Sequence, residues 1–253
     1  MEIVARSPKE IPGAYSSYYV KLADHFLRQI GSHHFGVVLE AGCGKGQLTI
    51  PLLEKMPPRV RMLAADSSRK PYKGWLDKLR ARLAKSILKN RVRVIEADVT
   101  RMPEVNRNSV DLIVSNELFC DLVPKARLDR ALGEFWRVLR PGGVMVHGEW
   151  SSDSQIGARS LLVKHWPSWS PDQLHSALLH QGFGNVQVSY FETTVRFLYE
   201  AAMEELRGWG ASENLLRAHM RALKREGFRL PFEHVIRCEK GPRGRESDSN
   251  WDG

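Results

Sequence analysis

The chain has 253 residues, 42% of them hydrophobic, and 38 Lys and Arg against 29 Asp and Glu give it a formal charge of +9 at pH 7. This length supports one substantial core, so we expect one domain with an insertion rather than two domains. With no apolar run of about eighteen residues and no apolar leader at the N-terminus, we expect a cytoplasmic protein without a membrane span. The three cysteines, Cys43, Cys120 and Cys238, are far apart and lack CxxC spacing, which argues against disulfides and a structural metal.

A helix is expected near the N-terminus, followed by alternating strands and helices. Apolar residues recur at helical spacing over 15–30, and Gly31 follows them. From residue 37, short β-branched runs alternate with helical stretches of about a dozen residues. The expected strands lie at 37–41, 60–65, 92–97, 110–115 and 144–148. This alternation predicts an α/β fold with a parallel sheet and helices on both faces.

The basic segment 69–93 holds ten Lys or Arg against the single acid Asp77. Leu76, Leu79, Leu83 and Ile87 recur at helical spacing within it, which predicts an amphipathic helix with a basic outer face. Such a face can bind nucleic acid or serve as an ordinary solvated exterior, and we favour the solvated exterior.

The expected helix at 125–139 runs into the turn Arg140-Pro-Gly-Gly143, and the pattern changes beyond Trp150. A polar loop at 151–159 and a Trp-rich stretch at 164–169 lead to a helix that Ser170 caps, with Pro171 at its first position. Strands are expected at 186–191 and 232–238, separated by a mostly helical insertion too long for a hairpin. The polar, Gly-rich segment 241–253 is expected to be disordered.

The segment Glu40-Ala-Gly-Cys-Gly-Lys-Gly46 joins an apolar strand to a helix through glycines at every second position. Glycines so close together let a ligand lie against the backbone, which is typical of a nucleotide-binding turn. The dinucleotide fingerprint needs a small residue where this chain has Gln47, so a dinucleotide is disfavoured.

Acidic residues end three successive predicted strands, at Glu40, Asp66 and Asp98. In open α/β sheets ligands bind at this carboxyl edge, where Asp66 can accept from both hydroxyls of a ribose. Asp98 is placed to accept from an exocyclic amine. An edge so rich in carboxylates suits a cationic nucleoside better than a phosphorylated one.

With these motifs the chain resembles the class I, Rossmann-like S-adenosylmethionine-dependent methyltransferases, and is similar to their small-molecule (type 11) group. The resemblance covers about 15–240. It implies a seven-stranded, mostly parallel sheet with the last strand antiparallel and a helical insertion between the last two strands. It also implies an N-terminal lid helix within 1–35 and a methyltransferase domain at 36–240 with a cap at about 193–230.

The resemblance implies S-adenosyl-L-methionine as cofactor and assigns residues to it. The methionine part would be wrapped by Glu40, Gly42, Cys43, Gly44 and Gly46. Asp66 and its neighbour Ser67 would bind the ribose, and Asp98 and Val99 would bind the adenine. Asn116, in Ser115-Asn-Glu-Leu-Phe119, would line the methyl-transfer site. Tyr15 and Tyr19 on the lid helix would attract the sulfonium or pack as ordinary helix residues, and both readings stay open.

The catalytic candidates are His147, Glu117 and Tyr19. His147 is either a general base or a core histidine, with the core reading favoured, and Glu117 and Asp121 are alternative bases. Asn116-Glu-Leu-Phe119 lacks the Pro-Pro-aromatic box of related enzymes that methylate planar amino groups. Cys120 is not expected to be a nucleophile.

A small-molecule acceptor is favoured, with RNA or protein methylation through the basic face as the alternative. A non-catalytic nucleoside-binding subunit is a third hypothesis, which the intact acids at 40, 66 and 98 oppose. The aromatic residues Phe197, Trp209 and Phe228 of the insertion, and the loop Trp166-Pro-Ser-Trp169, would cover the acceptor or form the core of the cap. The oligomeric state stays open.

Overall fold

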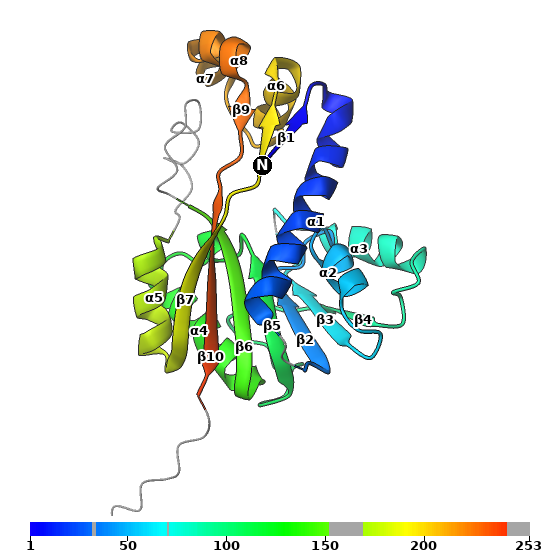
Figure 1. The fold of residues 1–253 in the computed structure, drawn as a ribbon, viewed down its shortest axis with the longest axis vertical. Helices are drawn as coiled ribbons and strands as arrows, with labels where there is room; N and C mark the ends of the chain where they lie inside the picture. Colours follow the sequence, from blue (N-terminus) through cyan, green and yellow to red (C-terminus); the bar gives the residue numbers. More distant parts are fainter. Residues whose placement is uncertain (32–33, 70, 152–168, 242–253) are drawn as a thin grey trace, which may run out of the picture.

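The fold is described for residues 1–31, 34–69, 71–151 and 169–241 of a computed structural model (Figure 1). It consists of a central sheet with helices on both faces and a cap above the carboxyl ends of its parallel strands. Helix α1 runs from the cap down one face of the sheet. None of the helices in the described ranges has the length and apolarity needed to cross a membrane.

The central sheet has seven strands in the order β4-β3-β2-β5-β6-β10-β7. β10 pairs antiparallel with both neighbours, and the other contacts are parallel, so the seven-stranded sheet with its last strand antiparallel is confirmed. The strands are β2 (Val37–Ala41), β3 (Arg61–Asp66), β4 (Val92–Glu96), β5 (Val110–Asn116), β6 (Leu139–Trp150), β7 (Phe183–Phe191) and β10 (Glu233–Lys240).

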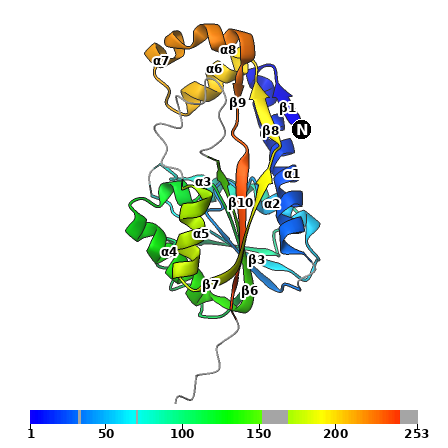
Figure 2. The same ribbon diagram turned by 60° about the vertical axis from the view of Figure 1, so that its left-hand side comes forward.

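Helices cover both faces of this sheet, as expected (Figure 2). On one face lie α1 (Ile11–Ile30), α2 (Thr49–Lys55) and α3 (Trp75–Ala84), and on the other α4 (Lys125–Val138) and α5 (Pro171–His180). The predicted cap of α5 is present: the Ser170 side chain accepts from Gln173 N–H, and Gln173 accepts from Ser170 N–H.

Two predictions of helix, at the end of the basic segment 69–93 and between β4 and β5, are wrong. Helix α3 ends at Ala84, so Ile87 is 93% exposed instead of joining Leu76, Leu79 and Leu83 in the core. Residues 97–109, between β4 and β5, form no helix. Contacts with α4 hold this crossover instead, because the Arg137 guanidinium donates to the carbonyls of Met102 and Val105 at 2.7 and 2.9 Å.

The insertion between β7 and β10 is mostly helical, as expected, but it also contains strands. β8 pairs in parallel with β1 at the start of the chain and antiparallel with β9, forming a second, three-stranded sheet. This sheet and three helices make the cap. Its elements are β1 (Glu2–Ala5), β8 (Thr194–Phe197), α6 (Tyr199–Gly208), α7 (Glu213–Ala218), α8 (Met220–Glu226) and β9 (Phe228–Arg229).

Short 3-10 turns at Pro8–Glu10 and Phe119–Asp121 complete the described elements. The N-terminal segment is therefore a strand and a helix, joined to the cap through β1. Most of the polar loop at 151–159, Trp166 and the tail expected to be disordered lie outside the described residues.

Candidate active site

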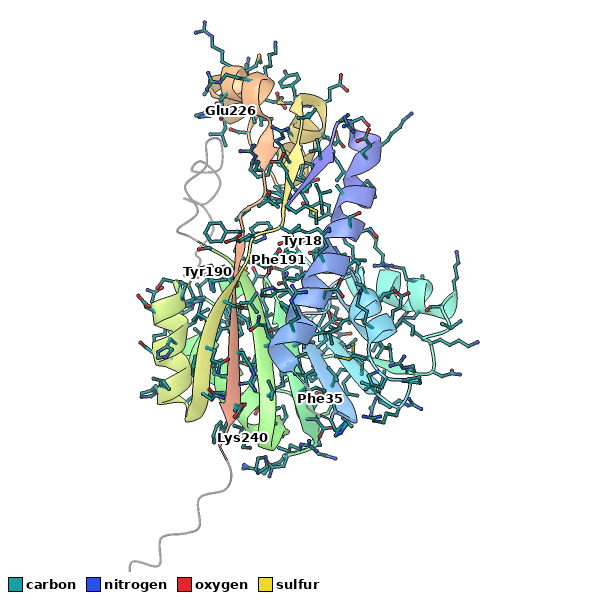
Figure 3. All side chains as sticks on the ribbon, in the orientation of Figure 1. Tyr18, Phe35, Tyr190, Phe191, Glu226 and Lys240 are labelled. Atoms are coloured by element: carbon teal, nitrogen blue, oxygen red, sulfur yellow. The ribbon has the colours of Figure 1, made fainter. Side chains whose placement is uncertain are left out.

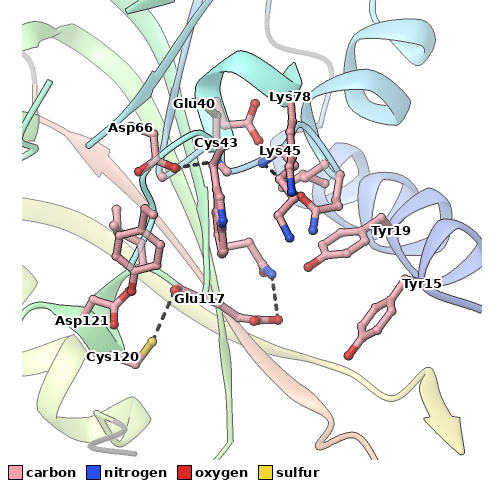
Figure 4. A pocket seen from close by; sticks show the side chains of 18 of the residues that line it. Tyr15, Tyr19, Glu40, Cys43, Lys45, Asp66, Lys78, Glu117, Cys120 and Asp121 are labelled. Atoms are coloured by element: carbon pink, nitrogen blue, oxygen red, sulfur yellow. Dashed lines mark hydrogen bonds between the residues drawn. The ribbon is translucent and has the colours of Figure 1, made fainter. Parts of the chain in front are cut away.

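A cleft of about 1690 Å³ lies between the carboxyl edge of the sheet, helices α1 and α3, and the cap (Figure 4). Most of the predicted site residues line it. They are Tyr15, Tyr19, Glu40, Gly42, Cys43, Gly44, Asp66, Ser67, Asp98, Val99, Asn116 and Glu117. Gly46 and His147 are the two predicted residues that do not.

The glycine turn is folded back against the end of β3. The amides of Gly42 and Cys43 both donate to the Ala65 carbonyl, at 2.9 and 3.0 Å. Gly46 has φ +80°, and a Cβ there would collide with Leu79 of α3. The third glycine is therefore needed where the turn packs against α3, and it does not line the cleft.

The carboxylate of Asp66 joins the turn to the end of β3. Its two oxygens accept from the Gly44 and Ser67 amides, each at 2.6 Å. Burial raises the pKa of Asp66, while these two hydrogen bonds lower it. Asp66 thus ends β3 at the carboxyl edge of the sheet, as its place in the sequence predicts, and the structure adds its contact with the glycine turn.

Glu40 lies deep in the cleft, with 2% of its surface exposed. Among the described residues, its Oε2 atom has no hydrogen-bond partner. Burial raises the pKa of Glu40 to about 8, against a lowering effect of Thr49. A buried carboxyl group with one unused oxygen is ready to accept a hydrogen bond from a ligand.

Asp98 lies at the far end of the same edge and stays ionised. Its Oδ1 atom accepts from the amide and hydroxyl of Thr100 at 3.0 and 2.8 Å, and Arg69 Nη1 lies 3.3 Å from Oδ2. Burial raises its pKa, but the hydrogen bonds from Thr100 and the charges of Arg127 and Arg69 outweigh this effect and hold it below its usual range.

At the end of β5 the chain turns sharply through Glu117, which has a φ of 49°. Left-handed backbone at a residue other than glycine costs energy and is concentrated at functional sites. The Asn116 amide donates to Glu117 Oε1 at 3.3 Å. Burial, followed by the charges of Glu233 and Glu149, raises the pKa of Glu117 well above its usual value.

The tyrosines of α1 divide between the cleft and the core. Tyr15 and Tyr19 line the cleft, and the Tyr15 hydroxyl donates to Glu205 of α6 at 2.6 Å, which links α1 to the cap. Tyr18 is buried against the sheet, where it donates to Glu233 and packs edge-on against Phe191 at 5.4 Å (Figure 3).

His147 does not reach the cleft, which corrects its placement as a candidate base. It is fully buried, stacks on Phe119 with ring centroids 3.6 Å apart, and its Nδ1 atom lies 2.8 Å from Ser115 Oγ. Side chains alternate along a strand, so Glu149, two residues on, shares its face and lies 3.5 Å from His147 Nε2. Because β6 ends beside the cleft, Glu149 and Trp150 line it, as expected.

Cys120 lines the cleft, where burial and the charge of Glu149 raise the pKa of its thiol and so disfavour the nucleophilic thiolate. In the cap, Phe197 and Phe228 are buried in the cap's own core, whereas Trp209 lines the cleft. Trp169 donates to the Phe119 carbonyl at 2.8 Å and lies outside the cleft.

Sequence reasoning missed several residues of the cleft. Glu205 lies on a cap helix with no motif around it. Lys45 and Trp75 also line the cleft, with the ammonium 4.5 Å from the ring centroid. Glu233 lies behind the cleft at the start of β10. The sequence alone does not show which face of this strand points inward, because that depends on its pairing with β6.

Comparisons with known proteins agree with this geometry. Residues 38–143 match the family described as a methyltransferase domain. The comparison with curated proteins gives no match. Among solved structures, the chain is similar to phosphoethanolamine N-methyltransferase 2 from Haemonchus contortus, with a TM-score of 0.60 and 14% identity over 87% of this chain. It spans 53% of that protein, about half its length.

Two further solved structures share the fold over most of their length. Geranyl diphosphate C-methyltransferase from Streptomyces coelicolor A3(2) has a TM-score of 0.60 and 16% identity, over 92% of this chain and 83% of that one. The 4+2 cyclase SpnF has a TM-score of 0.61 and 17% identity, over 88% and 82%. One fold thus carries different reactions, and the residues of the cleft must decide between them.

Proposed function

We propose that the chain is a class I S-adenosylmethionine-dependent methyltransferase and that it transfers a methyl group from S-adenosylmethionine to a small-molecule acceptor. When bound, the cofactor supplies a methyl group activated on a sulfonium. The transfer is an in-line displacement, so the protein has to align the two partners and exclude water.

The unpartnered oxygen of Glu40 is the observation that carries this proposal. A buried carboxyl group lacking a donor fits the amino group of the methionine part. Asp66 stands at the end of the next strand with its carboxylate toward the glycine turn, where it fits a ribose. Asp98 and Val99 follow at the third strand end and fit the adenine.

The cap supports a small acceptor. Helix α6 closes the cleft from above through the contact between Tyr15 and Glu205, and Trp150 and Trp209 stand beside it. Structures with the same fold include enzymes named for phosphoethanolamine and for geranyl diphosphate, both small molecules. In this arrangement Tyr19, Asn116 and Glu117 line the space where the acceptor would meet the methyl group.

Calorimetric titration with S-adenosylmethionine and S-adenosylhomocysteine tests the cofactor assignment. We expect both to bind, and Asp66→Ala to weaken binding about 10- to 100-fold, because hydrogen bonds to a charged group are worth about 1.5–3 kcal/mol each. Asp77→Ala, at a side chain 80% exposed on α3, is the control. A wild-type protein that binds neither nucleoside would refute the proposal.

The acceptor class is tested by labelled methyl transfer into cell extract. The basic outer face of α3 keeps RNA or protein methylation as a second candidate, because Lys85 and Lys89 are exposed beside it. Label that stays at low molecular weight after nuclease and protease digestion supports the small molecule. Label that digestion releases from large polymers supports the second candidate.

A further inference from the structure

Carboxyl groups from four elements gather at the acceptor end of the cleft. Glu117 after β5, Glu149 on β6 and Glu205 on α6 line it, and Glu233 of β10 lies directly behind. The chain as a whole is basic, with a charge of +9. Yet in the part of the chain that the structure describes, none of these four carboxyl groups forms an ion pair with Lys or Arg. This end of the cleft therefore gathers four carboxyl groups, none of them held by an ion pair with Lys or Arg in the described residues.

Aromatic rings line the same end from two sides. Tyr15 and Tyr19 of α1 lie with ring centroids 6.4 Å apart, and Trp150 and Trp209 lie 5.3 Å apart. Figure 4 shows the Glu117 carboxylate on the side of the cleft where the two tyrosines stand, away from Asp66. The faces of Tyr and Trp rings attract cations, and best of all cations stripped of water.

Two buried acceptor atoms behind this end also lack a donor. Within the described ranges, neither Asn116 Oδ1 nor Glu233 Oε2 has a hydrogen-bond partner, although Glu233 is fully buried. Both atoms lie where they would collide with a Cβ added to Gly148, beside Glu149, so they are neighbours. Unpaired acceptors that are buried together call for a proton or a hydrogen-bond donor at that place.

We propose that this end of the cleft binds an alkylammonium group, so that the methyl acceptor is an amine. The carboxylates balance its charge and the four rings contact its alkyl groups. The statement that the bound amine is the methyl acceptor rests on the proposed function, whereas the binding of an alkylammonium group does not. The sulfonium does not account for the cluster, because Glu40 and Asp66 already supply the acids expected around the donor.

An ammonium with N–H bonds has no lone pair, so it must lose a proton before it can accept a methyl group. Glu117 is the carboxyl group best placed to take that proton, since it lines the cleft at the end of β5. The proton passes from nitrogen to a carboxylate oxygen of Glu117, and the electron pair of the broken N–H bond stays on nitrogen.

Binding of a cation should also release protons from the cluster. Burial and neighbouring carboxylates raise the pKa of Glu117, and that of Glu233 to about 8, so the empty site holds protons at neutral pH. Besides the four carboxyl groups of the cluster, the titratable groups around it are two further carboxyl groups, three phenols, an imidazole and two ammonium groups. They are Glu40 of β2, Asp121 of the turn, Tyr15, Tyr18 and Tyr19 of α1, His147 of β6, and Lys45 and Lys78 on the side of the glycine turn.

The test compares choline with 3,3-dimethyl-1-butanol, which has the same shape with carbon in place of the charged nitrogen. Each is titrated calorimetrically into the full chain in the presence of S-adenosylhomocysteine. We expect choline to bind at least about tenfold more tightly than the alcohol. We also expect its binding enthalpy at pH 7 to vary with the ionisation enthalpy of the buffer, which reports released protons.

Variants separate the site from general charge effects. Glu117→Gln should weaken choline binding at least about tenfold, while Glu104→Gln, on an exposed loop, should not change it. Retained affinity for S-adenosylhomocysteine shows that each variant is folded. Equal binding of choline and the alcohol, or no choline binding by a protein that binds S-adenosylhomocysteine, overturns the inference. Choline binding without nucleoside binding leaves the ammonium site standing and refutes the proposed function instead.

Discussion

Burial raises the pKa of Glu40 and that of Glu233 to about 8, so these carboxyl groups hold protons at neutral pH unless a bound ligand ionises them. Within the described ranges of the chain, no cation beside either group favours its ionisation. An ionised carboxylate at either position therefore destabilises the fold at high pH, unless a cation or a hydrogen-bond donor lies beside it.

This protonation makes stability depend on pH. In the unfolded chain the two carboxyl groups release their protons near pH 4.5, but in the folded protein only near 8, so stability is lost as the pH rises through that window. We expect the free energy of unfolding to fall by up to about 1.4 kcal/mol per pH unit for each group. Glu233→Gln should remove the contribution of Glu233 to this pH dependence. Urea unfolding between pH 5 and 8 measures how steeply the free energy of unfolding falls with pH in the wild type and in the variant. Equal slopes in the two proteins would contradict the assignment.

Gly46 and Gly142 both have a positive φ, but they differ in the atoms that an added Cβ would contact. Gly46→Ala should cost about 1–2 kcal/mol for left-handed backbone and about 1–3 kcal/mol more for the collision with Leu79. Gly142→Ala is the matched control, because it shares the positive φ but has nothing within 4 Å of the new Cβ. The extra cost should shrink in a Leu79→Ala background, as denaturant unfolding of the double mutant would show. A cost equal to that of Gly142→Ala would rule out the packing role.

At the scale of elements, the sequence predicts what local pattern determines. β2 and the start of α4 lie where periodicity places them, and the alternation predicts the parallel sheet, whose seven strands the resemblance implies. The small sheet could not be predicted, because β1 has only four residues and its partner β8 lies far along the chain. The acids at strand ends were visible, whereas Glu205 was not, since a cap helix has no fixed relation to the sheet edge.

Strand β1 supports the cap over the cleft. Removal of residues 1–6 should raise the KM for the acceptor and expose 194–229 to protease, because β8 loses its parallel neighbour. Affinity for S-adenosylhomocysteine should change by less than about twofold. Glu2→Gln is the control: it removes the ion pairs with Arg196 and Arg229 but keeps the strand pairing. Unchanged kinetics in the truncated protein would show that the cap stands without β1.

For the molecule as a whole, the distribution of charge matters more than its total. Acids occupy the acceptor end of the cleft, while basic residues such as Lys85 and Lys89 at the end of α3 face solvent. A basic exterior raises affinity for polyanions without choosing a substrate. The net charge of +9 therefore describes the surface and not the acceptor.

Reversing charge on this surface separates the two roles. Lys85→Glu combined with Lys89→Glu should weaken retention on immobilised heparin. Methyl transfer to low-molecular-weight material should change by less than about twofold, since neither residue lines the cleft. Parallel loss of heparin binding and methyl transfer would instead favour a macromolecular acceptor. Glu104→Gln, on an exposed loop, is the control for the effect of a surface substitution alone.

The pairing of β1 with β8 also sets an order of events during synthesis. Glu2 pairs with Thr194, so the first strand has no partner until most of the chain has been made. At about 5–20 residues per second this interval lasts roughly 10–40 seconds. The central strands β2 to β5 can associate earlier, because their partners are closer in sequence. The strands that carry the donor half of the cleft can thus pair with one another before β1 pairs with β8 in the cap.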